Sequence, residues 1–526
     1  MRAGALALGA VLTAALGAAP AHARGNHAAL GEIIKASRLI NALRLDEARR
    51  AVADLAKRAP DQVEVRWLEA ELAFHDGDYG GAIGFLKGIP DDAVDGLAGQ
   101  TRSLAANTLA VTSGLLAKDS PGGHFTLYYA PGPDELMVDL AGETLDRAWQ
   151  VIGDDIGLHP AGKIRVEILG RPRDLARVST LTEQEIETTG TIALSKYGKL
   201  MVVSPRATVS GYAWMDTLAH EYTHLVVSQA THDQVPVWMQ EGLARFEQIR
   251  WRAEPSLVLP TSDRRLLAAA LKNRRLIGFD EMGPSFAKLP SHDAAALAYA
   301  EVFTLVAWMH GQVGYAGLRT MLGKITSGRS ARRAVAEAMN RSWLEVEKGW
   351  QANLRSLDLA PGRSARDHRV RFGHGGHDDD NVGLDGVAAG KARKHARLGG
   401  LLRARNMLAA AAIEYEKALA VTGPGDPFIA GKLARTYVDL GKFDRAVELA
   451  RPLAADDDAD PVAAVTLGVA AAATADWPSA AAAFEQAIRI TPFDPTVRCG
   501  LAEVYDQQND PRAAREHTAC DRLRAP

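Results

Sequence analysis

The sequence predicts an α+β domain, in which a small mixed sheet precedes a mainly helical part, flanked on both sides by all-α repeats. Three observations carry this prediction. Alternating apolar patterns, typical of strands, lie within residues 124–205. Helical patterns follow from Trp214 onward. Both ends of the chain carry helical segments that recur at intervals of 34 or 35 residues.

The first residues have the composition of a secretory signal peptide. Arg2 precedes an apolar run that ends at Pro20, and the triplet Ala21–Ala23 offers a small-x-small cleavage site. The run is shorter than the ~20 residues that a membrane anchor needs. We therefore expect cleavage after Ala23 and a protein that is periplasmic or secreted, with no membrane span after signal removal.

The remaining chain divides into four parts. We expect an amino-terminal helical region over 24–120, a central domain over 121–360, a linker over 361–395 and repeats over 396–526. With 526 residues the chain is too long for a single core. Its formal charge of −3 gives no reason to expect nucleic acid as a partner.

The carboxy-terminal part contains related helical segments. AIEYEKAL (412–419), AVELARPL (446–453) and AAAFEQAI (481–488) each precede a turn that carries proline. This spacing resembles the tetratricopeptide repeat, a helix–turn–helix unit that buries its apolar face by stacking on its neighbours. A weaker version occupies residues 44–92. Such arrays generally bind proteins, so we expect a protein partner there.

The linker and the cysteines leave alternatives open. HGGHDDD (374–380) has the composition of a weak metal site, but a solvated polar loop is favoured. Cys499 and Cys520 are the two cysteines of the chain and lie in the last predicted helix pair. An oxidising compartment favours a disulfide between them, and two buried thiols are the equal alternative.

The central domain begins with strands. HFTLYYA (124–130) and KIRVEIL (163–169) alternate and are separated by a helical pattern over 134–157. GTIALS (190–195) and KLMVVSP (199–205) flank the turn Tyr197-Gly198, which predicts a hairpin.

Residues 220–224 read His-Glu-Tyr-Thr-His and follow the last predicted strand. On a helix, His220 and His224 share one face, so both imidazoles can bind one zinc ion. Glu221 then points to the side of the metal, where it can take a proton from the bound water. Chance also produces this pentapeptide, so a third ligand is needed.

Glu241 is the candidate third ligand. It lies 17 residues after His224 on a helix that begins at Pro236. A carboxylate there completes a His₂Glu site with one position left for water. An exposed helix carboxylate is the alternative when Glu241 is considered alone.

The motif HExxH followed by PxWxxEGLAxxxE resembles the gluzincin clan of zinc metallopeptidases. It is most similar to the peptidase MA-like group of bacterial envelope proteins, and membrane-alanyl aminopeptidases are more distant. The resemblance covers about 121–355. It implies a Zn²⁺ held by His220, His224 and Glu241, with Glu221 as the general base and acid. Glu247 is either a partner of a ligand imidazole or, as we expect, an exposed carboxylate.

The resemblance also implies a tyrosine that stabilises the oxyanion. Tyr299 follows Glu241 by 58 residues in a helical pattern and fits this role, with a core tyrosine as the alternative. His310 and Tyr315 are weaker candidates. The aminopeptidases carry a strand glutamate that grips the substrate's amine, and TTGTIALS (188–195) has no carboxylate. Its backbone can still pair with an extended peptide.

These residues favour a zinc-dependent endopeptidase, whose repeats bind a protein substrate or partner. One alternative is a non-enzymatic cell-envelope scaffold with a structural or vestigial zinc site. Another is a zinc amidase that acts on cell-wall peptides, which fits the same residues and compartment.

Overall fold

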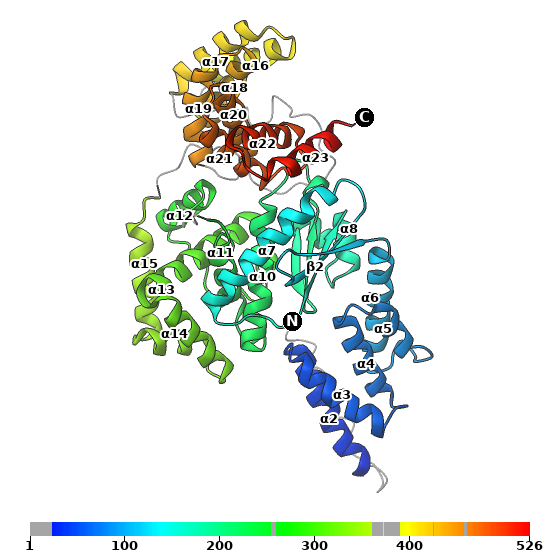
Figure 1. Cartoon of the computed structure of the whole chain (residues 1–526). Coiled ribbons are helices and arrows are strands. Elements are labelled where there is room, and N and C mark those ends of the chain that lie inside the picture. The colour runs from blue at the N-terminus through cyan, green and yellow to red at the C-terminus, as the bar shows by residue number, and fades with distance from the viewer. Residues whose placement is uncertain are drawn as a thin grey trace.

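The computed structural model describes residues 24–253, 259–283, 285–359, 372, 390–423, 426–456 and 460–525. The expected signal peptide, the HGGHDDD segment and most of the expected linker lie outside the described residues. Within the described residues, no helix has the length and apolar character needed to cross a membrane. Figure 1 shows two helical arrays at opposite ends of a central α+β domain.

The central domain is built on a five-stranded sheet of order β1-β2-β3-β5-β4. The four predicted strands are present as β2 Phe125–Tyr129, β3 Ile164–Leu169, β4 Ala193–Lys196 and β5 Lys199–Val203. β2, β3 and β5 are parallel, and β4 joins β5 through a tight hairpin. Tyr197 and Gly198 both have positive φ, as the two central residues of a type I′ turn require. The mixed sheet is confirmed.

β1, Leu116–Asp119, is a strand that the sequence pattern did not predict. It pairs antiparallel with β2 and lies before residue 121, the expected start of the domain. All four of its residues are exposed, so the segment has no buried face to produce an alternating pattern. Pairing with β2 alone makes it a strand.

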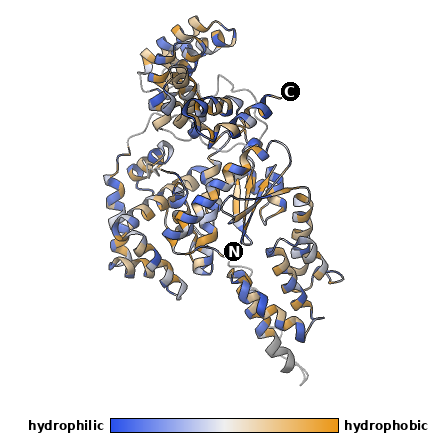
Figure 2. Cartoon of the chain, viewed as in Figure 1, coloured by the Kyte–Doolittle hydropathy of each residue, from blue (hydrophilic) through white to orange (hydrophobic). Residues whose placement is uncertain are grey.

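Helices cover both faces of the sheet. α7, Glu135–Ile156, connects β2 to β3 and packs with α10, Trp214–Thr231, on one face. α8, Pro172–Arg177, and α9, Glu183–Thr189, cover the other face. Figure 2 shows hydrophobic colour along the strands and hydrophilic colour on the outer sides of the helices. α10, the zinc-motif helix that carries His220 and His224, is therefore fixed against the sheet.

The rest of the central domain is helical. These elements are α11 Val237–Glu247, α12 Thr261–Asn273, α13 His292–Thr326, α14 Ala331–Met339 and α15 Trp343–Ser356, with short 3₁₀ turns η2 Pro205–Ala207 and η3 Phe286–Lys288. α13 is interrupted at Gly314, where φ is 61°. Strands first and helices after is the predicted α+β layout, and it is confirmed.

The amino-terminal region forms its own apolar core from five helices. They are α2 Arg24–Asn41, α3 Leu45–Arg58, α4 Val63–His75, α5 Tyr79–Phe85 and α6 Leu97–Thr112. A buried polar network joins this region to the sheet. The Tyr79 hydroxyl donates to Glu167 on β3, and the Lys199 ammonium on β5 donates to both, with distances of 2.7 to 3.0 Å.

The carboxy-terminal array contains α16 Gly390–Ala404, α17 Leu408–Thr422, α18 Pro427–Asp439, α19 Phe443–Asp456, α20 Pro461–Ala473, α21 Trp477–Ile488, α22 Pro495–Gln508 and α23 Ala513–Arg524. Three of these helices start in the same way, with an aspartate N-cap and proline as the first helical residue: Asp426, Asp460 and Asp494. α16 begins inside the segment that we expected to be linker. Cys499 and Cys520 form a disulfide between α22 and α23.

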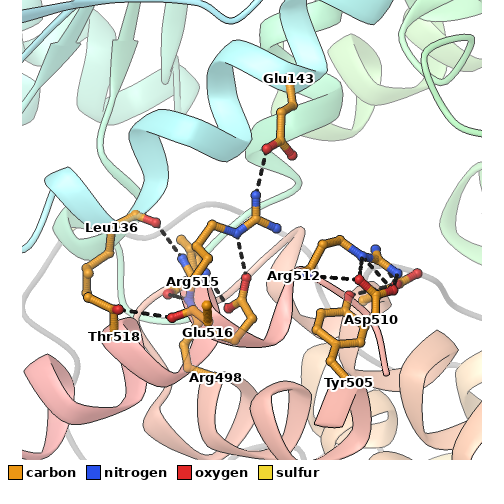
Figure 3. Close-up of polar contacts among 12 residues, drawn as sticks. Leu136, Glu143, Arg498, Tyr505, Asp510, Arg512, Arg515, Glu516 and Thr518 are labelled. Atoms are coloured by element: carbon orange, nitrogen blue, oxygen red, sulfur yellow. Dashed lines mark hydrogen bonds and ion pairs between the residues drawn. The ribbon is translucent and has the colours of Figure 1, made fainter. Parts of the chain in front are cut away.

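This array shares a core with the central domain. Arg498, fully buried on α22, donates to the Leu136 carbonyl of α7 and pairs with Glu516, each at 2.7 Å (Figure 3). Arg515 pairs with Glu143 on α7 (Figure 3). The Trp214 indole, at the start of α10, donates to the Ile488 carbonyl. The array therefore contacts both α7 and the zinc-motif helix.

Candidate metal centre

α10 presents two imidazoles on one face. His220 and His224 are one helical turn apart, and their Nε2 atoms are separated by 3.1 Å. The opposite side of the helix is anchored in the core by the buried side chains of Leu218, Tyr222 and Leu225. The helix therefore has little freedom to rotate, and both imidazoles point to one place.

α11 brings Glu241 to the same place. The chain reverses after α10 through His232 and Asp233, both with positive φ, and α11 starts directly after Pro236. Glu241 Oε2 lies 3.5 Å from His220 Nε2 and 3.4 Å from His224 Nε2. Gly242 allows this position, because a Cβ there would lie 2.8 Å from a methyl group of Val306 on α13.

The three donor atoms fit a zinc ion. They form a triangle with sides of 3.1, 3.4 and 3.5 Å. In a tetrahedral zinc site with bonds of about 2.0–2.1 Å, ligand atoms lie about 3.3–3.4 Å apart. Within the described residues, these three side chains are the one group of histidines, cysteines and carboxylates close enough to hold a metal ion.

The environment of the donors also suits a cation. Glu241 Oε2 is buried and has no hydrogen-bond donor within the described residues, and a cation would satisfy it. The three side chains keep 14 to 19% exposure, so solvent reaches the triangle. A partly exposed His₂Glu set is typical of catalytic rather than structural zinc.

The charges of the three groups depend on one another. Burial alone would raise the pKa of Glu241, but the nearby imidazoles of His224 and His220 outweigh it and hold the pKa below its usual value. Burial opposes protonation of His224, yet the Glu241 carboxylate raises its pKa. The Glu241 carboxylate and the His224 imidazole therefore each stabilise the charged form of the other.

Glu221 directly follows the metal-binding candidate His220 on α10, a helix that packs against β4. Its side chain is buried, and the backbone N–H of Ser195 on β4 is near enough to lower the pKa of its carboxyl group. Burial raises the pKa of Glu221, with the two imidazoles acting in the opposite direction. The predicted general base is thus placed beside the metal ligands and beside the last strand of the sheet.

Tyr299 on α13 is electrostatically coupled to the same site. Burial raises the pKa of its hydroxyl, the carboxylates of Glu241 and Glu221 raise it further, and the guanidinium of Arg245 opposes them. Its ring packs against Phe286 with centroids 4.8 Å apart.

The two weaker candidates for the oxyanion role, His310 and Tyr315, form an aromatic cluster with Phe246. Burial raises the pKa of Tyr315, and the carboxylates that add to this effect are Glu247 and Asp155, not the two at the site. Of the three candidates for the oxyanion role, only Tyr299 is coupled to the site's carboxylates.

Glu247 is not the exposed carboxylate that we expected, and within the described residues no hydrogen bond joins it to an imidazole. It is fully buried beside Asp155, whose carboxylate pairs with Arg250 at 2.9 Å. Burial and the charge of Asp155 raise its pKa well above the usual value. Six helical positions separate it from Glu241, which turns it about 120° away from the metal ligands. This burial could not be predicted from the local sequence, because Asp155 comes from α7.

Arg245 is a cation near Glu241 that sequence reasoning missed, and its charge opposes the effect of the two carboxylates on the pKa of Tyr299. It follows Glu241 by one helical turn and is therefore on the same face of α11. That spacing was the available signal.

Two known protein families match different parts of the chain, and these parts correspond to the central domain and the two helical arrays. Residues 146–356 match the peptidase MA superfamily, and residues 35–95 and 432–495 match the tetratricopeptide repeat. None of the curated proteins is similar enough to count as a match.

Three solved structures illustrate the distant similarities. Native yeast LTA4 hydrolase is 11% identical over 78% of this chain and 67% of its own, with a TM-score of 0.31. MamA MSR-1 C2 is 23% identical over 27% of this chain and 83% of its own, with a TM-score of 0.24. Yeast Tom70 is 12% identical over 93% and 84%, with a TM-score of 0.23.

The two family matches agree with the geometry. The peptidase MA match contains all three donors of the triangle and Glu221, and the repeat matches coincide with the helical arrays on either side. Residues 146–356 thus form a domain of the peptidase MA superfamily, and tetratricopeptide repeats flank it on both sides.

Proposed function

We propose that the protein is a zinc-dependent endopeptidase. The observation that carries this proposal is the convergence of His220, His224 and Glu241 within 3.5 Å at a place that solvent reaches, with Glu221 beside them. The three donors would hold the zinc ion. When bound, it would supply Lewis-acid chemistry, polarising the scissile carbonyl and acidifying the attacking water.

Two side chains near the triangle would carry out proton transfer and stabilisation of the oxyanion. The Glu221 carboxylate takes the proton from the attacking water and later gives it to the leaving amine. The Tyr299 hydroxyl donates a hydrogen bond to the oxygen on which negative charge develops.

An extended peptide fits against the free edge of the sheet. β4 is the last strand, paired on one side with β5, so its other edge has no strand partner within the described residues. α10, which carries Glu221, packs against β4, and the backbone of Ser195 on β4 lowers the pKa of Glu221, so a peptide that adds to this edge would pass near the general base. An edge without a carboxylate to grip a free amine supports endopeptidase rather than aminopeptidase activity.

The flanking repeats and the disulfide support the rest of the proposal. Tetratricopeptide arrays bind proteins, so these repeats would present a protein substrate or recruit a partner. The Cys499–Cys520 disulfide favours an oxidising compartment, in agreement with a periplasmic or secreted protein.

The test is metal content and proteolysis of wild type and Glu221→Gln. We expect both proteins to bind one zinc per chain. Wild type should cleave unfolded casein, and the variant should be about 10²–10⁴-fold slower, because it cannot accept the proton. Glu448→Gln, the same change at an exposed position of α19, is the matched control and should keep full activity.

A chelator should abolish cleavage by wild type, and added zinc should restore it. If both proteins bind zinc and neither cleaves casein or a broad peptide library, the protein is a scaffold with a structural metal site and the proposal is wrong.

A further inference from the structure

Arg245 lies on the face of α11 that carries the metal-binding candidate Glu241. The two residues are four apart in one regular helix, so their side chains are neighbours. The Arg245 side chain is 29% exposed, more than any of the three metal-binding candidates. It is therefore partly desolvated but reachable from solvent.

The charge of Arg245 acts on the same hydroxyl as the site's carboxylates do. The pKa of Tyr299 is raised by the carboxylates of Glu241 and Glu221. It is lowered by the guanidinium of Arg245, the one cation of the three groups. This effect agrees with the position of Arg245 on α11, one helical turn from the metal-binding candidate Glu241 and on the same face of the helix.

The contacts of Arg245 hold it in position without using all its donors. Its Nη2 donates to Asp263 on α12 at 3.2 Å, and its Nη1 to Gln248 at 3.4 Å. A guanidinium has five N–H donors, so most remain available. Within the described residues, no other hydrogen-bond acceptor or ion-pair partner contacts Arg245.

Asp263 is suited to orienting this guanidinium. Its side chain is 9% exposed and accepts a second hydrogen bond, from the Ser262 hydroxyl at 3.3 Å. A nearly buried carboxylate cannot follow Arg245 into the solvent. It therefore holds one nitrogen of the guanidinium in place, and the remaining N–H groups are left for a ligand.

We propose that Arg245 is a specificity-determining residue that binds a carboxylate of the substrate peptide next to the scissile bond. The proposal rests on the proposed function. A planar guanidinium matches a carboxylate with two parallel hydrogen bonds, and partial burial strengthens them. The carboxylate comes from an acidic side chain or from the peptide's own C-terminus, and the experiment separates these two sources.

The experiment compares quenched-fluorescence peptides that differ by one carboxylate. One series replaces Glu by Gln at each of the two positions on either side of the scissile bond. A second series replaces the free C-terminus by an amide at increasing distance from that bond. The enzymes are wild type, Arg245→Gln, Arg245→Lys and the control Arg333→Gln, which changes an exposed arginine of α14.

We expect wild type to prefer the carboxylate peptide about tenfold in kcat/KM at one position, as for a charge-assisted hydrogen bond of ~1.4 kcal/mol. Arg245→Gln should lose this preference, Arg245→Lys should keep part of it, and Arg333→Gln should keep all of it. Zinc content and melting temperature report whether each variant is folded.

Two results would overturn the proposal. One is equal cleavage of every pair by wild type. The other is an equal fall in kcat for all peptides in Arg245→Gln, because Arg245 would then act on the transition state and not on a substrate carboxylate.

Failure of the proposed function has a different signature. If wild type cleaves no peptide, binding of the same pairs to Glu221→Gln is measured by calorimetry, with Arg245→Gln added in a second variant. A tenfold preference for the carboxylate that disappears in the double variant supports the Arg245 site, and equal binding of both peptides refutes it.

Discussion

Among single residues, Tyr299 offers a direct test of the proposed mechanism. Two carboxylates and one guanidinium change the pKa of its hydroxyl, and Tyr299 is not one of the three metal-binding candidates. Tyr299→Phe removes the hydroxyl and little else. We expect kcat to fall about 10²-fold, as when one oxyanion donor is removed, with KM and zinc content nearly unchanged. Steady-state kinetics and metal analysis check this.

Tyr315→Phe is the matched control for that experiment. It makes the same change on the same helix, beside Asp155 and Glu247 rather than at the metal site. We expect its kcat to stay near the wild-type value. Equal losses in the two variants would show that either change disturbs α13 as a whole, and Tyr299 would lose its assigned role.

At the scale of elements, Glu301 connects α13 to the segment before it. Its buried carboxylate accepts a hydrogen bond from the Ile277 N–H, and burial raises its pKa from 4.5 to about 8. The folded protein therefore holds this proton more tightly than the unfolded chain. The resulting stabilisation is fully present below pH 4.5 and is lost as the pH rises through 8.

Glu301→Gln replaces the carboxyl by a neutral group of the same shape. We expect the variant and wild type to have similar melting temperatures at pH 5, and the variant to be more stable at pH 8.5. The difference should grow with pH by at most ~1.4 kcal/mol per unit. Thermal unfolding across this range, with Glu448→Gln as the control, tests it. A constant difference would mean that Glu301 does not titrate here.

The elements show which features a sequence can predict. The ligand triangle was predictable, because two ligands are one turn apart and the third is on the next helix, so nearby sequence fixes their geometry. β1 and the burial of Glu247 were not, because each depends on a partner from another element. Propensity and periodicity describe one element at a time.

At the scale of the whole molecule, the carboxy-terminal array is part of the central core rather than an attached module. Phe484 and Tyr505 belong to the same apolar cluster as Leu218 and Trp214 of α10. Arg498 adds a polar link, since it joins Glu516 on α23 to the Leu136 carbonyl on α7 (Figure 3). We therefore expect the array and the metal site to unfold together.

Arg498→Met tests this expectation. It leaves the buried Glu516 with Arg515 as its remaining cation and removes a donor from two carbonyls, so we expect a loss of about 3 kcal/mol. Arg512→Met, on the same array but 45% exposed, is the control and should cost at most ~1 kcal/mol. Circular dichroism and zinc release should report the same transition temperature in wild type, and this temperature should fall by the same amount in both measurements for Arg498→Met. If the helical signal of the array is lost at a lower temperature than zinc, the two parts fold independently, and the contacts through Arg498 serve only to attach them.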